Sequence, residues 1–147
     1  MTDRKALAES KRWVIKIGSS LITNEGQGLD TKAMQGWAQQ ISELRNQGKE
    51  ILLVSSGAVA EGMARMGWKK RPHALHKLQA AAALGQMGLV QQFESCFQQH
   101  GIHTAQVLFT NNARSDQQRY LNAPHTLRPL PPLGALPNTT NTKTSPH

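Results

Sequence analysis

The sequence is poor in cysteine, in aromatic side chains and in long apolar runs. Cys96 is the single cysteine among 147 residues, so no disulfide can form within the chain. No apolar run reaches the roughly 18 residues that a membrane span requires. Residues 1–10 carry mixed charge without the apolar stretch of a secretory signal. We therefore expect a soluble, cytoplasmic protein without a membrane partner.

Acidic residues are also scarce. Asp and Glu number 9 against 17 Lys and Arg, the net charge is +8, and no acidic residue follows Asp116. Such an excess is typical of proteins that bind nucleic acid or small anions. The basic residues are dispersed apart from the run 69–71 beside Trp68, which favours a solvated loop over a nucleic-acid surface. The six histidines lack acidic partners at metal-ligand spacing, so no metal site is expected.

Hydrophobic periodicity predicts an alternation of strands and helices. Apolar runs typical of buried strands occupy residues 13–17, 51–54 and 104–110, and helical spacing occupies residues 29–47, 58–66, 75–99 and 115–123. This order predicts an α/β domain with a mostly parallel sheet.

Small residues predict where the helices begin and end. Asp30 or Thr31 could cap the helix at 29–47, and Gly48 is a plausible stop. Gly85 and Gly88 interrupt the stretch 75–99, which leaves open either two helices or one helix with a tight contact.

Composition divides the chain into three parts. Residues 1–11 are polar and expected to be mobile, and residues 12–123 are expected to form the folded domain. Residues 124–147 hold six of the seven prolines, which remove backbone donors and break helices. The stretch 138–143 has neither helical nor strand periodicity, so we predict an irregular or disordered tail from Pro124 onward.

The first candidate for chemistry is a tight turn of small residues, Lys16-Ile17-Gly18-Ser19-Ser20, directly after a buried strand. Ligands of parallel sheets bind at the carboxyl ends of strands. Gly18 allows a phosphate to approach the backbone, and turn amides can cradle an anion. Lys16 would neutralise a transferring phosphoryl group. The alternative is a strand-end lysine that only reaches solvent, and the longer glycine loop of the Walker pattern is absent.

The second candidate is Ser55-Ser56-Gly57, again at a strand-to-helix junction. Two hydroxyls and a glycine at a helix N-terminus suit a small anionic group. The alternative is that Ser55 or Ser56 only caps the helix. A phosphoryl-transfer site built from both turns requires them to face each other, with Lys16 and Ser56 on the same side of the sheet.

In this order and at this separation, the two turns resemble those of the amino acid kinase family. Further segments narrow the resemblance to the glutamate 5-kinases, and together they cover roughly residues 11–123. These segments are residues 14–21, 53–62, 66–68, 79–86 and 119–123. The turn at 55–58, the alanine-rich stretch ending at 86 and the Tyr-Leu-Asn-Ala stretch at 120–123 are the most specific.

The resemblance implies a three-layer sandwich around a mostly parallel sheet. It also implies transfer of the ATP γ-phosphoryl group to the side-chain carboxylate of L-glutamate, the first step from glutamate to proline. Lys16 would be catalytic and would bind ATP together with Gly18 and Ser19, with Mg2+ accompanying the nucleotide. Ser56 and Gly57 would bind glutamate. Members of this family form homo-oligomers, and a nucleic-acid partner is not expected.

The chain departs from the family pattern toward its end. The family has an acidic, substrate-binding stretch near the position of residues 140–143, where Lys143 replaces an aspartate. Ala113 and Arg114 also deviate, and the second half of the family domain, with the nucleotide-base site, is missing. We therefore expect an incomplete domain that is inactive alone, and we hypothesise a shifted reading frame or a decayed gene.

Two other interpretations stay open. The first is a basic, non-catalytic binding module, which steep salt dependence of nucleic-acid binding would reveal. The second is a kinase of a related substrate such as acetylglutamate or aspartate, against which the turn at residues 55–58 argues.

Overall fold

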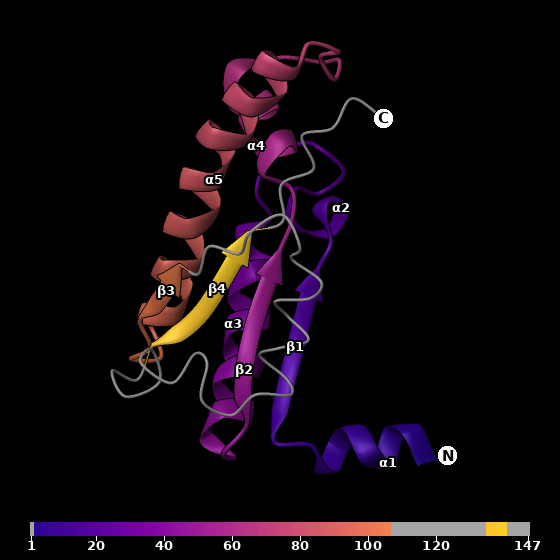
Figure 1. The fold of residues 1–147 in the computed structure, drawn as a ribbon. Coiled ribbons are helices and arrows are strands. Elements are labelled where there is room, and N and C mark those ends of the chain that lie inside the picture. Colours follow the sequence, from indigo (N-terminus) through magenta and orange to yellow (C-terminus); the bar gives the residue numbers. More distant parts are fainter. Residues whose placement is uncertain (1, 107–134, 141–147) are drawn as a thin grey trace.

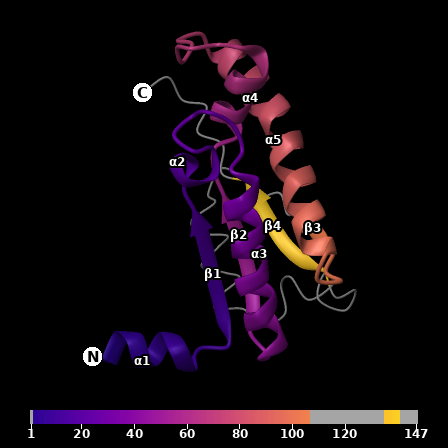
Figure 2. The same cartoon turned by 180° about the vertical axis from the view of Figure 1, so that it is seen from behind.

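The structure, a computed structural model, describes residues 2–106 and 135–140 (Figure 1). The strands are β1 (Arg12–Ile17), β2 (Glu50–Ser55), β3 (Thr104–Gln106) and β4 (Leu136–Thr140). The helices are α1 (Thr2–Glu9), α2 (Ser19–Ile22), α3 (Thr31–Asn46), α4 (Ala58–Met66) and α5 (Leu75–Gln98). The predicted α/β fold with a parallel sheet is confirmed. The described residues contain a sheet and the helices on one of its faces, and the third layer of the sandwich stays a prediction (Figure 2).

Within the described residues, the sheet has four parallel strands in the order β1-β2-β4-β3. β2 pairs with β1 on one side, up to Ile17 opposite Ser55, and with β4 on the other, where Leu53 lies opposite Asn138. The last of the described strands in chain order, β4, therefore lies inside the sheet. Parallel pairing brings the carboxyl ends of β1 and β2 to one edge, which is the upper edge in Figure 1.

The main core lies between the sheet and the helices α3, α4 and α5. Leu53 and Leu136 contribute from the sheet, and Phe93 and Phe97 of α5 stack with their ring centroids 6.3 Å apart. Cys96 is buried in the same cluster. Burial of this apolar surface is the main favourable contribution to folding.

Local signals define α3 as the sequence predicts. The carboxylate of Asp30 accepts a hydrogen bond from the backbone amide of Ala33 at 3.0 Å, so Asp30, not Thr31, is the N-cap. Beyond the end of α3, Gly48 has φ of +91°, a backbone conformation that favours glycine.

Glycines allow α4 and α5 to cross in close contact. A Cβ added at Gly62 would overlap the backbone carbonyl of Ala81, and one added at Gly85 would overlap the carbonyl of Ala58. α5 is one unbroken helix. Of the two alternatives for residues 75–99, the single helix with a tight contact is therefore correct.

The tail contains the clearest departure from the predictions. An irregular segment was expected from Pro124 onward, but Leu136–Thr140 forms strand β4. The prediction is wrong there because pairing with β2 and β3 satisfies the backbone and outweighs the low strand propensity of Pro137 and Asn138. The rest of the predicted tail, the helix at 115–123 and residues 107–110 of the predicted strand lie outside the described residues.

The N-terminal segment is helical in the structure. α1 covers most of the residues for which mobility is expected, and its Leu7 side chain is exposed. The ammonium group of Lys49 holds the end of this segment by donating to the carbonyls of Ala8 and Ser10 at 2.7 and 2.5 Å. The boundary between residues 11 and 12 stays a prediction.

Candidate functional site

Two turns adjoin at the carboxyl edge of the sheet. The first follows β1 at Gly18 and Ser19, and the second follows β2 at Ser56 and Gly57. Because Ile17 lies opposite the last residue of β2, the two strands end at the same level. The structure thus makes neighbours of the two turns that the sequence singled out.

Ser56 connects the turns directly. Its backbone amide and its hydroxyl both donate to the carbonyl of Ile17, each at 3.1 Å. Gly57 is the N-cap of α4, and no side chain caps this helix. Ser55 is fully buried, and its Oγ has no hydrogen-bond partner among the described residues. The alternative in which Ser55 or Ser56 only caps the helix is therefore wrong.

Gly57 has two reasons to be glycine. Its φ is +103°, which side chains rarely tolerate. A Cβ at this position would lie 3.2 Å from Cγ2 of Thr23 and 3.3 Å from Cα and Oγ of Ser19. The second turn therefore packs against the first at the point where a side chain would separate them.

Lys16 lies on the face of the sheet opposite the main core. Its neighbour Ile17 is buried in that core, whereas Val14, two residues earlier, packs with Leu52 and Val54 on the other face. Alternation along a strand places Lys16 with Val14, beside its register partner Val54. The side chain of Lys16 is exposed there, at the end of β1 and next to the Gly18 turn.

Two buried polar residues, one touching the turns and one in the helix that follows the second turn, were missed in the sequence. Thr23 is 1% exposed, and its hydroxyl donates to the carbonyl of Ser19 at 2.7 Å and accepts from the amide of Gly26 at 3.1 Å. Nothing in the sequence separates this threonine from a surface one. Glu61 is buried in α4, and the signal for it was present: it is the lone acidic residue of that helix.

Among residues 2–106 and 135–140, no three His, Cys, Asp or Glu side chains gather as metal ligands. In the same ranges, no helix combines the length and apolar character needed to cross a membrane.

A groove of about 630 Å³ lies along the outer face of α5, away from the two turns. It is lined by Ala83, Gln86, Met87, Val90, Gln91, Glu94 and Gln106.

Comparison with known families finds one family over the residues that form the parallel sheet and the two turns. The chain belongs to the amino acid kinase family, whose sequence pattern matches residues 11–144 and so includes β4.

Curated relatives narrow the similarity further. The chain is 63% identical over 134 residues to the glutamate 5-kinase of Thioalkalivibrio sulfidiphilus. It is 60% identical over 131 residues to that of Nitrosospira multiformis and 58% identical over 134 residues to that of Burkholderia thailandensis. These alignments cover 91%, 89% and 91% of this chain but 36%, 35% and 36% of the relatives. The chain therefore spans about a third of the length of the relatives that it matches.

Proposed function

We propose that this chain is part of an enzyme that transfers the γ-phosphoryl group of ATP to the side-chain carboxylate of L-glutamate, giving L-glutamyl 5-phosphate. The main support for the proposal is that the two turns are in contact: the amide and the hydroxyl of Ser56 both donate a hydrogen bond to the carbonyl of Ile17. Identities of 58–63% to proteins named glutamate 5-kinase support glutamate as the substrate. A cytoplasmic location and a homo-oligomeric assembly belong to the same proposal.

Lys16, Gly18 and Ser19 would hold the phosphates of ATP. A Cβ placed on Gly18 meets no atom within 4 Å, so the backbone of this turn is open to an approaching group. The exposed ammonium of Lys16 would offset the negative charge of the transferring group, because phosphoryl transfer depends on positioning and charge neutralisation. Mg2+ would arrive with ATP, since this ion is commonly held through substrate phosphates and few protein carboxylates.

Ser56 and Gly57 would hold glutamate. The hydroxyl of Ser56 donates its proton to the carbonyl of Ile17, so the lone pairs of Oγ remain to accept a hydrogen bond. An acceptor of this kind suits the ammonium group of an amino acid. The turn contact would then keep the amino acid next to the phosphate-binding turn, in the proximity that the transfer requires.

Isothermal titration calorimetry with the 147-residue chain tests the proposal, with binding as the readout. Lys16→Ala should weaken binding of ATP–Mg2+ at least about tenfold, because a charge-assisted hydrogen bond is lost, and leave L-glutamate binding unchanged. Ser56→Ala should show the opposite pattern, with a loss of about fivefold for L-glutamate. Lys32→Ala, an exposed lysine in the first turn of α3, is the matched control.

Two results would contradict the proposal. One is the absence of binding of either ligand at millimolar concentration by the unsubstituted chain. The other is an equal loss in Lys32→Ala and Lys16→Ala, which would mean that net charge rather than the turn binds ATP.

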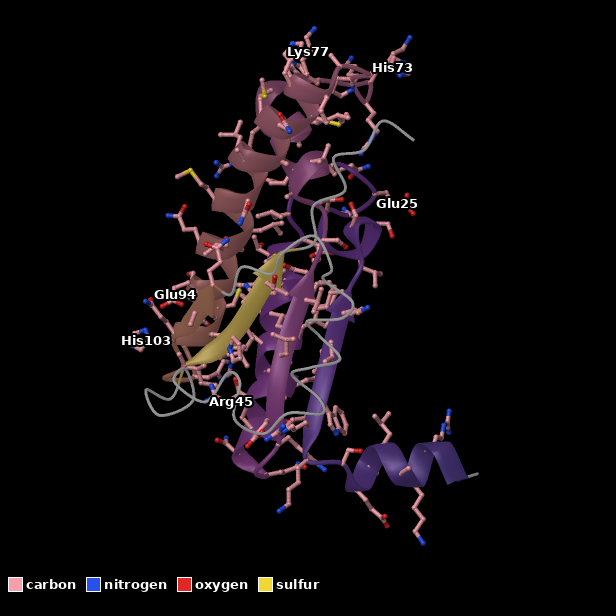
Figure 3. All side chains as sticks on the ribbon, viewed as in Figure 1. Glu25, Arg45, His73, Lys77, Glu94 and His103 are labelled. Atoms are coloured by element: carbon pink, nitrogen blue, oxygen red, sulfur yellow. The ribbon has the colours of Figure 1, made fainter. Side chains whose placement is uncertain are left out.

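One observation favours a second candidate, the basic binding module. Residues 62–93 contain five Lys and Arg residues and no Asp or Glu. Four of these, Lys69, Lys70, Arg71 and Lys77, are exposed around the connection between α4 and α5, and Figure 3 shows Lys77 at the upper end of the described residues. Binding of single-stranded DNA that falls steeply with salt, and that substitution of residues 69–71 by Gln abolishes, would favour this candidate.

A further inference from the structure

The outer face of α5 is uncharged over most of its length. No Lys, Arg, Asp or Glu occurs between Lys77 and Glu94, which stand about five helical turns apart. A helix face that stays in water ordinarily carries charged side chains. Met87 is nevertheless 70% exposed near the middle of this face. An uncharged, exposed face of this length is typical of a helix that packs against a partner.

Six side chains form a straight stripe along this face, and all six are exposed or half-buried. They follow one another at alternating spacings of four and three residues, which is the spacing of a coiled-coil seam. The stripe consists of His76, Ala80, Ala83, Met87, Val90 and Glu94. Because a helix turns by about 100° per residue, the stripe lies on the side of α5 opposite Gly85, the position that closely approaches α4.

The groove of about 630 Å³ on α5 runs along this stripe, since four of the six residues line it. Among the described elements, β3 borders the groove at one end through Gln106. The remainder of the face stands at the margin of the described structure in Figures 1 and 2. A groove of this kind, lined by apolar and amide side chains, suits a helix laid along it.

The sizes of the side chains are complementary about the middle of the stripe. Ala83 and Met87 lie two residues on either side of Gly85, and Ala80 and Val90 lie five residues on either side of it. An antiparallel second copy of α5 therefore brings Ala83 against Met87 of that copy. It likewise brings Ala80 against Val90. A small side chain faces a larger one at each level, as closely packed facing positions require.

The charges at the two ends of the stripe are also complementary. His76 and Lys77 stand in the first turn of α5, and Glu94 stands near its last turn. The side chain of Glu94 is 28% exposed, so its carboxylate can accept a further hydrogen bond. Antiparallel packing places the basic end of each copy beside Glu94 of the other, whereas parallel packing would place like charges together. The occupant that fits this face is therefore a second copy of the chain.

We propose that the stripe on α5 is a self-complementary docking surface, on which a second copy of this chain packs its own α5 antiparallel about a two-fold axis level with Gly85. An isologous contact of this kind closes after two copies. The proposal names the face through which the homo-oligomeric assembly proposed above would form, and it does not depend on binding of ATP or L-glutamate. One pair of helices makes a small interface, so the dimer should be weak and dependent on concentration.

Sedimentation equilibrium of the 147-residue chain tests for this dimer. The unsubstituted chain should show a reversible equilibrium between monomer and dimer. Met87→Lys should raise the dissociation constant at least about tenfold, because it brings an ammonium group into the apolar centre of the stripe. Ala83→Glu should do the same. Both substituted residues are exposed, so the fold should tolerate the changes. Gln40→Lys, at an exposed position of α3, is the matched control and should leave the equilibrium unchanged.

A mixture of the two variants tests the antiparallel register. In a heterodimer of Met87→Lys with Ala83→Glu, the new ammonium group faces the new carboxylate at one level. The original pair of Ala83 and Met87 is kept at the symmetry-related level. The mixture should therefore associate at least about fivefold more tightly than either variant alone. In a parallel arrangement positions 83 and 87 would not face each other, and mixing would bring no gain.

Each outcome supports or overturns the proposal. A chain that stays monomeric up to about 1 mM overturns the docking of a second copy and assigns the face to a partner of different sequence. A dimer that Met87→Lys and Ala83→Glu leave unchanged places the contact elsewhere and also overturns it. A mixture that associates no more tightly than the single variants overturns the antiparallel register. Because no ligand is present in these experiments, their failure is separate from a failure of the proposed function.

Discussion

β2 and β4 lie side by side in the sheet, and both are buried, but their sequences are opposite in character. The central Ile-Leu-Leu-Val of β2 is 0–3% exposed. β4 reads Leu-Pro-Asn-Thr-Thr, and its Asn138 is equally buried, at 2% exposure, with no hydrogen-bond partner for Oδ1 among the described residues. The burial of β4 therefore follows from its place between β2 and β3, whereas the burial of β2 also follows from its own side chains.

The close packing of α4 against α5 can be compared with the buried polar side chain of β4. At the crossing of α4 and α5, one added methyl group on Gly62 or Gly85 would overlap backbone atoms of the other helix. In β4, Oδ1 of Asn138 is buried without a hydrogen-bond partner among the described residues, as is Oγ of Ser55 at the end of β2, and an unpaired buried polar atom costs about 1–3 kcal/mol. Enlarging a side chain at the crossing of α4 and α5 should therefore lower the stability of the protein. Replacing the buried polar side chain of β4 by an apolar one can raise it.

The largest effect is expected for Gly85→Ala in α5. The new methyl group would overlap the backbone carbonyl of Ala58, which cannot move without displacing α4. Overpacking at backbone atoms should lower the free energy of unfolding by about 3 kcal/mol or more. Urea unfolding followed by circular dichroism measures this change.

Gly36→Ala in α3 is the matched control for Gly85→Ala. Gly36 is also helical, but a Cβ there meets nothing within 4 Å. Alanine should raise the free energy of unfolding by about 1 kcal/mol, because it is the better helix former. Equal effects of the two substitutions would show that α4 and α5 do not cross as closely as described.

A smaller effect of opposite sign is expected for Asn138→Val in β4. Valine removes an Oδ1 that has no partner among the described residues, has higher strand propensity and is similar in size, so the free energy of unfolding should rise by about 1–2 kcal/mol. Asn46→Val, the same change at an exposed position at the end of α3, should stay within about 0.5 kcal/mol of the parent. A loss of stability in Asn138→Val would mean that Asn138 has a partner, and the comparison between β2 and β4 would fail.

The contrast also explains which elements the sequence could predict. Apolar periodicity and local caps determine β1, β2, α3, α4 and α5, so residues such as Asp30 and Gly48 were sufficient to locate their ends. β4 could not be predicted, because its conformation depends on pairing with residues far away in the chain, such as Leu53 opposite Asn138. A polar segment with a proline carries no local sign of such a partner.

The candidate site divides in the same way. The two turns could be found because small residues directly follow two buried strands, and the register of β1 and β2 then makes them neighbours. Thr23 was missed because its contact with Ser19 arises only once the chain has folded, whereas Glu61 had a signal in the sequence as the lone acidic residue of α4. The roles of Lys16 and Ser56 stay predictions for the titrations to decide.

The smallest change in stability is expected at β3, the strand that pairs with β4. Hydrogen bonds to Glu94 connect β3 to the last turns of α5. The Glu94 carboxylate accepts from the amide and the hydroxyl of Thr104 at 2.7 and 2.5 Å and lies 3.1 Å from Nδ1 of His103 (Figure 3). Burial alone would raise its pKa, but these hydrogen bonds, with one from Gln98, lower the pKa from 4.5 to about 2. Stability from a lowered pKa is present above the unfolded value and is lost as pH falls through the folded value.

Glu94→Gln should therefore reduce the free energy of unfolding by about 1 kcal/mol at pH 7. The difference from the parent should shrink as the pH falls from 4.5 toward 2, where the parent carboxylate also becomes protonated. Urea unfolding of both proteins across this range measures the difference, and Glu43→Gln on the exposed side of α3 is the control. A difference that is constant with pH would show that the amide of Thr104 needs only an acceptor there, and that the attachment of β3 beside the polar strand does not depend on charge.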